Sequence, residues 1–510
     1  MGGRHCTGAE RRPRSASRLT AALLSLLLCA NCRTVPERSL HRAKIAGHWG
    51  PVIQLPTHPE QMVTLPSGKV LMWPWAPGRR EPRHGPVVLW NPVDGSSLVY
   101  GHTGLESASG LAFQPNGVLL SAGGDKPRGG VDGSPRAFTF DYRTERLTEV
   151  ASMARGRISP GATTLASGDI LVTGGLDEES HVNAVPELWD GREWTPLPAA
   201  RNDESGLGTF QFLAPDGRLF RAGPEPLTDW LDVTTGEWTD VEPAARNQVR
   251  YHGTAVMYDD GRILLAGGCP VGPEAGWSEQ CRDTALSTAE VIDLRDSSPT
   301  WRPVGTMARS RHSHHATLLP DGTVLITGGT DRPGIFHDED AGILEAELWD
   351  PQAENFVPVA AMSAPHHFQS TAVLLPDATV LVAGGRFGPG GDDVRFAWSG
   401  QVYYPAYLER GPRPVLTDLP GAVRYGAEFR VASPQAERIA SVVLMGLSTS
   451  RIGWNSNQRR VLLDFELTNR GLLVAGPDDP NLAPPGFYLL FGLSDGGTPS
   501  VGRVIRIEPG

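Results

Sequence analysis

The stretch Leu319-Pro-Asp-Gly-Thr-Val-Leu-Ile-Thr-Gly-Gly329 decides the fold, because variants of it recur along most of the chain. It begins with a polar turn at 320–322, continues as an apolar run rich in strand-forming residues, and ends with a double glycine. The same turn position recurs seven times, at Gly68, Gly117, Gly168, Gly217, Gly261, Gly322 and Ala378.

The copies follow one another at intervals of about 50 residues, which is the period of kelch repeats. Each repeat reads as short strands separated by turns, and a ring of such units leaves few exposed strand edges. We therefore expect an all-β chain in which residues 44–408 form a seven-bladed kelch-type β-propeller.

A second region begins after the linker at 412–415. Its strand-like runs are separated by Gly, Pro and Asn, a pattern that predicts a small immunoglobulin-like (early set) β-sandwich over residues 412–510. The expected strands are Glu428–Val431, Ser441–Leu444, Arg460–Leu463, Gly486–Phe491 and Val504–Ile507.

Composition narrows the possible partners. The chain has 510 residues and a formal net charge of -11, which argues against binding a polyanion, so we expect no nucleic-acid partner. With 60 glycines and 44 prolines, many short strands are favoured over long helices.

Residues 1–32 differ from the rest, since five arginines precede a short apolar core at 19–30. This pattern predicts an export signal, and the core is too short for a membrane span. We expect a secreted, periplasmic or cell-surface protein whose mature chain lacks a transmembrane domain. A genuine anchor, a start-site artefact and lipid attachment at Cys29 or Cys32 stay open as alternatives.

Removal of such a leader leaves Cys269 and Cys281, twelve residues apart. In an oxidising compartment these two residues are expected to form a disulfide that closes the loop after the fifth repeat. A zinc site is the alternative, but the tight cysteine spacing or neighbouring histidine pair that zinc needs is missing.

Four stretches carry a family resemblance: 47–51 with 70–73, 220–224, 288–293, and 483–491 with 498–501. Through them the chain resembles the galactose oxidase and glyoxal oxidase family of secreted copper-radical oxidases. The resemblance implies a seven-bladed kelch propeller followed by an immunoglobulin-like domain. It also implies oxidation of an alcohol or aldehyde with formation of hydrogen peroxide. Copper would be held by two histidines and two tyrosines, one tyrosine being cross-linked to a cysteine.

This chain departs from the family at each of those positions. Ala108 stands at the cysteine and Ser159 at the cross-linked tyrosine, Phe368 and Gln369 replace the axial tyrosine and first histidine, and Ser450 replaces the last histidine. Imidazole and phenolate suit Cu(II), whereas methyl, hydroxyl, phenyl and amide groups do not. We therefore expect no catalytic residues, no metal ligands and no cofactor.

A replacement site is a separate question, since histidines gather just before the turns of successive repeats. Arranged around a propeller axis, they would line a polar pocket or bind a transition metal. Alternatively, they are hydrogen-bonded within inner strands. The candidate pocket consists of Tyr251, His252, His312, His314 and His367.

The hypothesis that follows is an exported, monomeric, non-catalytic module that binds a carbohydrate or an envelope protein. This role rests on analogy of fold. The alternative is a copper-dependent oxidase with relocated ligands, Tyr251 and His252 being the nearest substitutes. A structural role in the envelope is the third possibility.

Overall fold

Each repeated turn forms the tip of a hairpin between two antiparallel strands. Gly322 joins β23 (His312–Leu318) to β24 (Val324–Thr330) with a φ of 86°, a left-handed conformation that glycine adopts without a Cβ clash. Ala378 takes the same conformation with a φ of 66°. The apolar residues after each turn are buried, which explains their unbroken hydrophobic runs.

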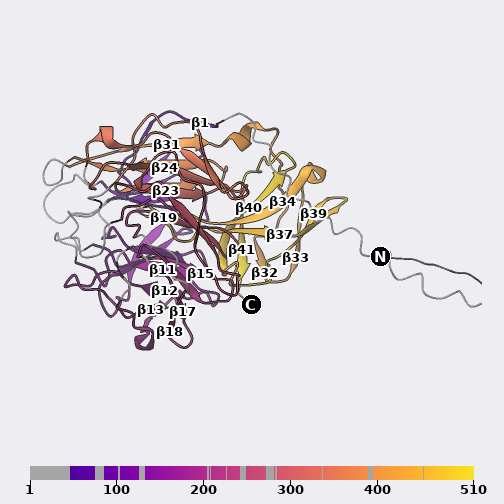
Figure 1. The fold of residues 1–510 in the computed structure, drawn as a ribbon. Coiled ribbons are helices and arrows are strands. Elements are labelled where there is room, and N and C mark those ends of the chain that lie inside the picture. The colour runs from indigo at the N-terminus through magenta and orange to yellow at the C-terminus, as the bar shows by residue number, and fades with distance from the viewer. Residues whose placement is uncertain are drawn as a thin grey trace, which may run out of the picture. The chain divides into compact units, whose positions relative to one another are not determined.

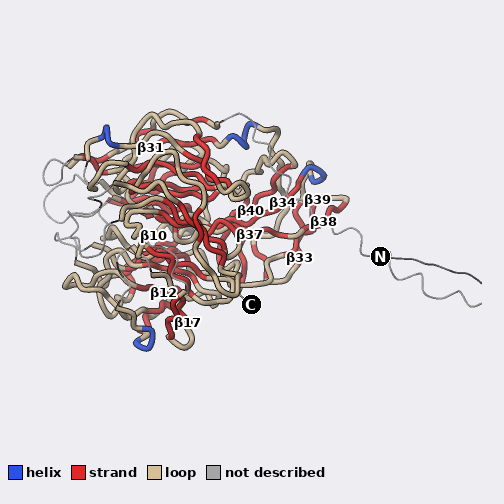
Figure 2. Tube along the Cα trace, in the orientation of Figure 1, coloured by secondary structure: helices blue, strands red, loops and turns tan. Residues whose placement is uncertain are grey.

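The computed structural model describes residues 46–509, except 75–84, 102–103, 126–131, 204–205, 207, 226, 242–248, 271–280, 282–283, 336, 389–393 and 452. The expected export signal at 1–32, with Cys29 and Cys32, lies outside the described residues. In the described ranges, no helix combines the length and the hydropathy that a membrane span requires. Strands and loops dominate the chain (Figures 1 and 2). The short 3₁₀ helices include η2 (Pro198–Ala200), η4 (Glu339–Ala341), η6 (Ala406–Glu409) and η7 (Ala436–Arg438).

The middle repeats each form one four-stranded antiparallel sheet. In chain order the strands are β7–β10 (Gly110–Phe113, Leu119–Ala122, Ala137–Asp141, Arg146–Val150), β11–β14 (Gly161–Thr164, Ile170–Thr173, Glu187–Trp189, Trp194–Pro196), β15–β18 (Phe210–Leu213, Leu219–Gly223, Asp229–Asp232, Glu237–Asp240), β19–β22 (Thr254–Asp259, Arg262–Ala266, Ala289–Asp293, Arg302–Pro303), and β23 and β24 with β25 and β26 (Glu347–Asp350, Asn355–Pro358).

The first and last repeats recruit strands from distant parts of the chain. The last sheet includes the start of the described chain, because β1 (His48–Trp49) and β2 (Ile53–Gln54) pair with its strand β31 (Ser399–Tyr404). The first sheet is extended by a hairpin from the C-terminal region. The first sheet contains β3–β6 (Gln61–Thr64, Val70–Trp73, Val87–Trp90, Ser97–Gly101) with β35 (Thr449–Arg451) and β36 (Trp454–Asn455); the last contains β27 (Ser370–Leu374), β28 (Val380–Gly384), β31 (Ser399–Tyr404), β1 (His48–Trp49) and β2 (Ile53–Gln54), and β29 (Arg386–Phe387) pairs with β30 (Arg395–Phe396).

The double glycines are where neighbouring repeats meet. A Cβ on Gly123 would lie 2.3 Å from the carbonyl oxygen of Arg157, and one on Gly328 would lie 2.2 Å from that of His366. On Gly384 of the last repeat, a Cβ would lie 1.9 Å from the carbonyl oxygen of Pro59 in the first. Only glycine permits this approach. The propeller-like all-β fold is thus confirmed, and the count of seven blades stays a prediction.

Two sheets follow in the C-terminal region, which runs from orange to yellow in Figure 1. Their facing residues, among them Val431, Val474, Leu444 and Leu490, share one buried core, as a β-sandwich requires. All five strand runs expected from the sequence are strands. The larger sheet contains β32 (Ala422–Arg424), β41 (Arg503–Glu508), β40 (Gly486–Ser494), β34 (Ile439–Gly446) and β37 (Arg460–Leu463); the smaller contains β33 (Glu428–Val431), β39 (Gly471–Ala475) and β38 (Phe465–Thr468).

Candidate functional site

The candidate site is built from residues just before or at the start of the first strand of a repeat. Ala108, Ser159, His252, Ser313 and Gln369 occupy equivalent places there, and all have a positive φ between 52° and 60°. For residues other than glycine, such a backbone costs about 1–3 kcal/mol and persists only where the surroundings fix it. Three of these five residues are positions at which the family resemblance implies a copper or radical group.

Backbone hydrogen bonds tie these places together across repeats. The amide of Ser159 donates to the carbonyl of Ala108 at 2.8 Å, and the amide of Ser313 donates to that of His252 at 2.7 Å. The amide of Gly208, at the same place in the intervening repeat, donates to Ser159 at 3.1 Å. The strand starts of successive repeats therefore lie side by side.

The β35–β36 hairpin of the C-terminal region brings in the last position. Ser450 Oγ accepts from Thr371 Oγ1 at 2.8 Å and from the amide of Ala372 at 3.3 Å. The next residue, Arg451, donates from Nη1 to the carbonyl of Ala108 at 3.2 Å. Ala108 is thus bonded to Ser159 and to Arg451, and the neighbouring Ser450 is bonded to the strand that follows Gln369, although these residues come from distant parts of the sequence.

The side chains at these positions do not fit the copper-radical group. Methyl, phenyl, hydroxyl and amide groups supply neither the imidazoles nor the phenolate that Cu(II) prefers, and none of these five side chains offers a thiol for a thioether. Over the described part of the chain, the one cluster of three potential ligands is Asp177, Glu179 and His181. Arg155 pairs with both of its carboxylates, and the cluster lies in a different loop.

Among the described residues, no three histidines of the expected pocket bring their ring nitrogens within 4.8 Å of one another. His252 lies near His312, with ring centroids 6.4 Å apart, and at 5.7 Å from Phe368. Both ring nitrogens of His312 are engaged, Nδ1 with Ser313 Oγ and Nε2 with the carbonyl of Arg332, each at 3.0 Å. Burial lowers the pKa of His312 to about 3. This histidine is therefore a neutral, structurally bonded group.

His314 and His367 pack against other residues, although both interact electrostatically with His312. The ring of His314 packs against Gly267 of the preceding repeat, where a Cβ would lie 2.4 Å from its Cε1. His367 packs edge-on against Phe387, with centroids 4.7 Å apart. Burial lowers the pKa of both imidazoles. Both rings therefore pack between neighbouring elements, and the candidate pocket stays a prediction.

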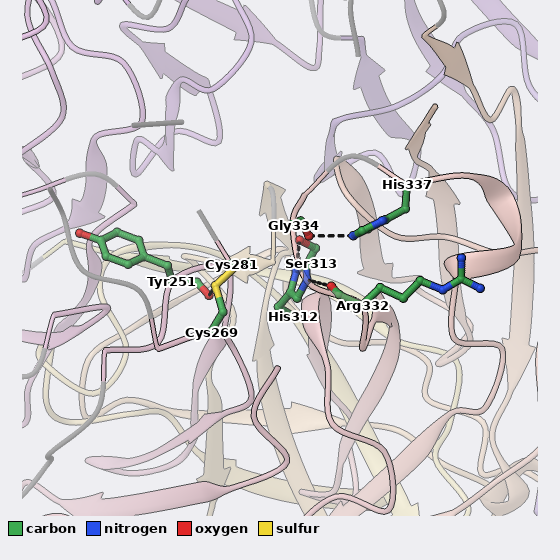
Figure 3. The surroundings of a disulfide bond; sticks show 8 residues. All are labelled: Tyr251, Cys269, Cys281, His312, Ser313, Arg332, Gly334 and His337. Atoms are coloured by element: carbon green, nitrogen blue, oxygen red, sulfur yellow. Dashed lines mark hydrogen bonds between the residues drawn. A yellow bond between two sulfur atoms is a disulfide. The ribbon is translucent and has the colours of Figure 1, made fainter. Parts of the chain in front are cut away.

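Tyr251 packs beside the disulfide that Cys269 and Cys281 form, which confirms the expected pairing. Figure 3 shows its phenol pointing away from His312. The hydroxyl donates to Glu225 Oε1 at 3.0 Å. Burial, with the neighbouring Glu225 carboxylate, raises the pKa of Tyr251 well above its usual value. A copper-binding phenolate is therefore disfavoured at Tyr251.

Sequence reasoning missed a charged group at the same site. Glu60, just before β3, is buried and accepts a hydrogen bond from Gln369 Nε2 at 3.4 Å. Its charged neighbours are Asp125, Arg386 and Arg451. Nothing in the local sequence distinguishes these residues from solvated surface charges, since their association depends on contacts between distant repeats.

Burial dominates the electrostatics of this charged group. It raises the pKa of Glu60 from 4.5 to about 8; Asp125 raises it further, whereas Arg451 and Arg386 oppose the shift. Burial also lowers the pKa of Arg451 to about 10. The site where the family resemblance implies a metal thus contains two carboxyl groups and two guanidinium groups in a region of low solvent access.

Comparison with known proteins supports the resemblance. Residues 413–507 match the family model of the galactose oxidase-like early set domain. Galactose oxidase of Gibberella zeae is 27% identical, over 94% of this chain and 72% of its own length. Aldehyde oxidase GLOX1 of Arabidopsis thaliana is 26% identical, over 79% of this chain and 71% of its own.

A solved structure gives the same fold. A fungal alcohol oxidase of the AA5 family, in complex with copper, is similar with a TM-score of 0.78 and 23% identity. The similarity covers 91% of this chain and 100% of the oxidase.

The expectation that the chain has no cofactor is contradicted by these comparisons. The relatives are oxidases by name, and the structure of similar fold was solved with copper. Copper is therefore the cofactor associated with this group of proteins, even though the five positions described above do not fit its copper-radical ligand set. By sequence and by fold, the chain is a relative of the galactose oxidase and glyoxal oxidase family.

Proposed function

We propose that this protein is an exported relative of galactose oxidase that has lost the tyrosine–cysteine radical centre. In this proposal it binds a ligand at the candidate site described above. The ligand is a carbohydrate or an envelope protein. The observation that carries the proposal is the replacement of all five copper-radical positions by Ala108, Ser159, Phe368, Gln369 and Ser450. Export rests on the pattern of residues 1–32, and the protein is expected to act as a monomer.

The loss of the radical centre has a direct chemical consequence. The family's two-electron oxidation needs the metal and an oxidisable phenol linked to sulfur. Ala108 and Ser159 cannot form a thioether, and neither offers an oxidisable group. A protein with these residues is expected to bind its ligand without oxidising it at this site.

The second candidate function is copper-dependent oxidation of alcohols or aldehydes with relocated ligands. The copper-bound relative favours it, and Tyr251 and His252 are the nearest substitutes. The bond from Tyr251 to Glu225 and the raised pKa of the phenol weigh against a phenolate ligand. We therefore rank this function second.

A copper and peroxide experiment separates the two functions. The purified mature protein is loaded with Cu(II), its metal content is measured, and peroxide is followed with galactose and small aldehydes, with galactose oxidase as the positive control. We expect neither peroxide nor a tyrosyl radical signal in optical and EPR spectra. Stoichiometric copper with sustained peroxide formation would overturn the proposal. Copper without peroxide agrees with it, since the proposal concerns the radical centre.

A further inference from the structure

A cavity lies where the repeat region meets the C-terminal region. Its volume is about 290 Å³, at the lower end of the range of about 300–1,000 Å³ for sites that bind small molecules. Its walls come from the end of β15, the turn after β19, the start of β37 and the loop before β40. None of the copper-radical positions and none of the candidate-pocket residues lines it, so it is a separate site.

Most charged side chains in the cavity wall are paired with other groups. These pairs are Arg295 with Asp293 at 2.6 Å, Asp259 with Arg262 at 3.6 Å, and Nε of Arg460 with the carbonyl of Pro320 at 3.0 Å. Two further charged residues line the cavity, Arg459 and Asp260. Among the described residues, neither forms an ion pair, and they act on each other only at longer range.

Arg459 has one free edge of its guanidinium group. Nη1 donates to the carbonyls of Asn481 and Leu482, each at 3.1 Å, which fixes the orientation of the group. Nε and Nη2 have no hydrogen-bond partner within the described ranges, yet they are not among the unpartnered polar atoms that are enclosed, so both are accessible. These two nitrogens form the edge that binds a carboxylate through two parallel hydrogen bonds.

Asp260 supplies the opposite charge. Its carboxylate forms no hydrogen bond with any described residue; Oδ1 is enclosed, whereas Oδ2 is accessible. Burial raises the pKa of Asp260, and Arg295 opposes the shift. A cation bound at Oδ2 would favour the ionised form of this carboxyl group.

The rest of the wall is largely apolar. Leu213 and Met257 are buried, Val461 and Leu482 are partly buried, and Leu462 is 53% exposed. A hydrophobic group in the cavity would cover Leu462, and removing apolar surface from water favours binding.

These features together select one class of ligand. A simple anion would leave Asp260 without a partner, and a simple cation would be repelled by Arg459. A ligand with both charges satisfies both residues, and an apolar group on the same ligand fits the remaining wall.

We propose that this cavity binds a free α-amino acid with an apolar side chain. Its carboxylate accepts from Nε and Nη2 of Arg459, its ammonium group donates to Oδ2 of Asp260, and its side chain packs against the apolar wall. The inference goes beyond the proposed function, because it concerns a different site and a different ligand.

Calorimetric titration of the full mature protein with L-leucine and L-methionine tests the proposal. Three analogues of leucine each lack one feature: isocaproate lacks the ammonium group, isoamylamine the carboxylate, and glycine the apolar side chain. The wild type is expected to bind at least one of the two amino acids, and to bind it at least about tenfold more tightly than each analogue, or about 1.4 kcal/mol. Phosphoethanolamine forms a separate arm, since it combines an ammonium group with a phosphate.

Two substitutions assign the charges. Asp260→Asn keeps the shape but removes the charge, so it should weaken binding of the amino acid about tenfold without weakening binding of isocaproate. Arg459→Lys keeps the charge but loses the two-nitrogen edge, so it should weaken binding of both. The matched control is Asp240→Asn, the same substitution at an exposed position of β18 outside the cavity, which should leave affinity unchanged.

Thermal unfolding of each variant excludes misfolding as the cause of a loss. Absence of binding of both amino acids to the wild type would overturn the proposal, as would equal affinity in wild type and Asp260→Asn. Tighter binding of phosphoethanolamine than of either amino acid would overturn it in favour of a phosphate-containing zwitterion. Peroxide formation is measured independently, so failure of this proposal and failure of the proposed function are distinguishable.

Discussion

At the scale of single residues, Glu60 is the most consequential side chain of the site. Its neighbours include one further carboxyl group, Asp125, and the guanidinium groups of Arg386 and Arg451. The two arginines do not fully offset burial, since the pKa of Glu60 is raised to about 8. Folding therefore favours the protonated form of this carboxyl group.

Glu60 should make stability depend on pH in a defined direction. Its pKa is higher in the folded state than in the unfolded chain, so its contribution to stability is fully present below pH 4.5 and is lost as pH rises to about 8. Glu60→Gln removes the titrating group, so this variant should lose less stability than wild type between pH 5 and about 8.5. Urea unfolding at both pH values measures the difference. Parallel pH profiles for the two proteins would contradict the assignment of the shift to Glu60.

The disulfide gives a second residue-scale prediction. Cys269 and Cys281 are twelve residues apart, and the bridge restricts the unfolded chain over that loop. Replacing both cysteines by serine should lower the free energy of unfolding by about 2–4 kcal/mol. Thermal unfolding with and without a reducing agent provides the check. Reduction should destabilise the wild type but not the variant, and an effect of the reductant on both would point to another cause.

At the scale of structural elements, a buried arginine holds together three strands in several repeats. Arg157, Arg250 and Arg311 precede the first strand and donate to the carbonyl of the first glycine of the double glycine, Gly174, Gly267 and Gly328. Arg311 also pairs at 2.7 Å with Glu347, which begins the third strand. Both charges are buried, so each depends on the other.

Replacing one partner of such an ion pair should lower the free energy of unfolding more than the loss of the pair as a whole would suggest, because the other charge stays buried without its partner. Arg311→Met leaves Glu347 buried without its cation and should lower the free energy of unfolding by about 3–5 kcal/mol. Adding Glu347→Leu should cost less than the sum of the two single substitutions, because the residues interact directly. Urea unfolding of the four proteins in a double-mutant cycle measures the coupling. Simple additivity would mean that the ion pair makes no specific contribution.

Elements were predictable from the sequence where the determining interactions are local. The turn at Gly322 and the apolar run after it specify a hairpin because both lie within a dozen residues. The site was predictable only in part. Ala108 and Gln369 were found by resemblance, whereas the approach of Gln369 to Glu60 depends on the first and last repeats meeting. His314 was placed in the pocket by spacing, yet the close approach at Gly267 directs it between two repeats.

At the scale of the whole described molecule, the C-terminal region completes the repeat region. Strands β35 and β36 contact first strands of several repeats, namely β3, β27, β19 and β23. Just after β36, the buried Gln458 bonds both backbone groups of Leu318 in β23, accepting from its amide at 2.9 Å and donating to its carbonyl at 2.7 Å. The Gln458 side chain, in the C-terminal region, thus satisfies the backbone amide and carbonyl of a residue in the repeat region.

Gln458→Leu should therefore loosen the connection between the two regions. The substitution keeps the volume but leaves the amide and carbonyl of Leu318 without their side-chain partner, which should lower the free energy of unfolding by about 2–4 kcal/mol. Because the lost bonds join the C-terminal region to the repeats, proteolysis in the linker around 412–415 should also become faster. Thermal unfolding and limited proteolysis measure the two effects, with Gln352→Leu at an exposed turn as the matched control. If cleavage in the linker is no faster in Gln458→Leu than in that control, the two regions are held together by apolar contacts rather than by this amide.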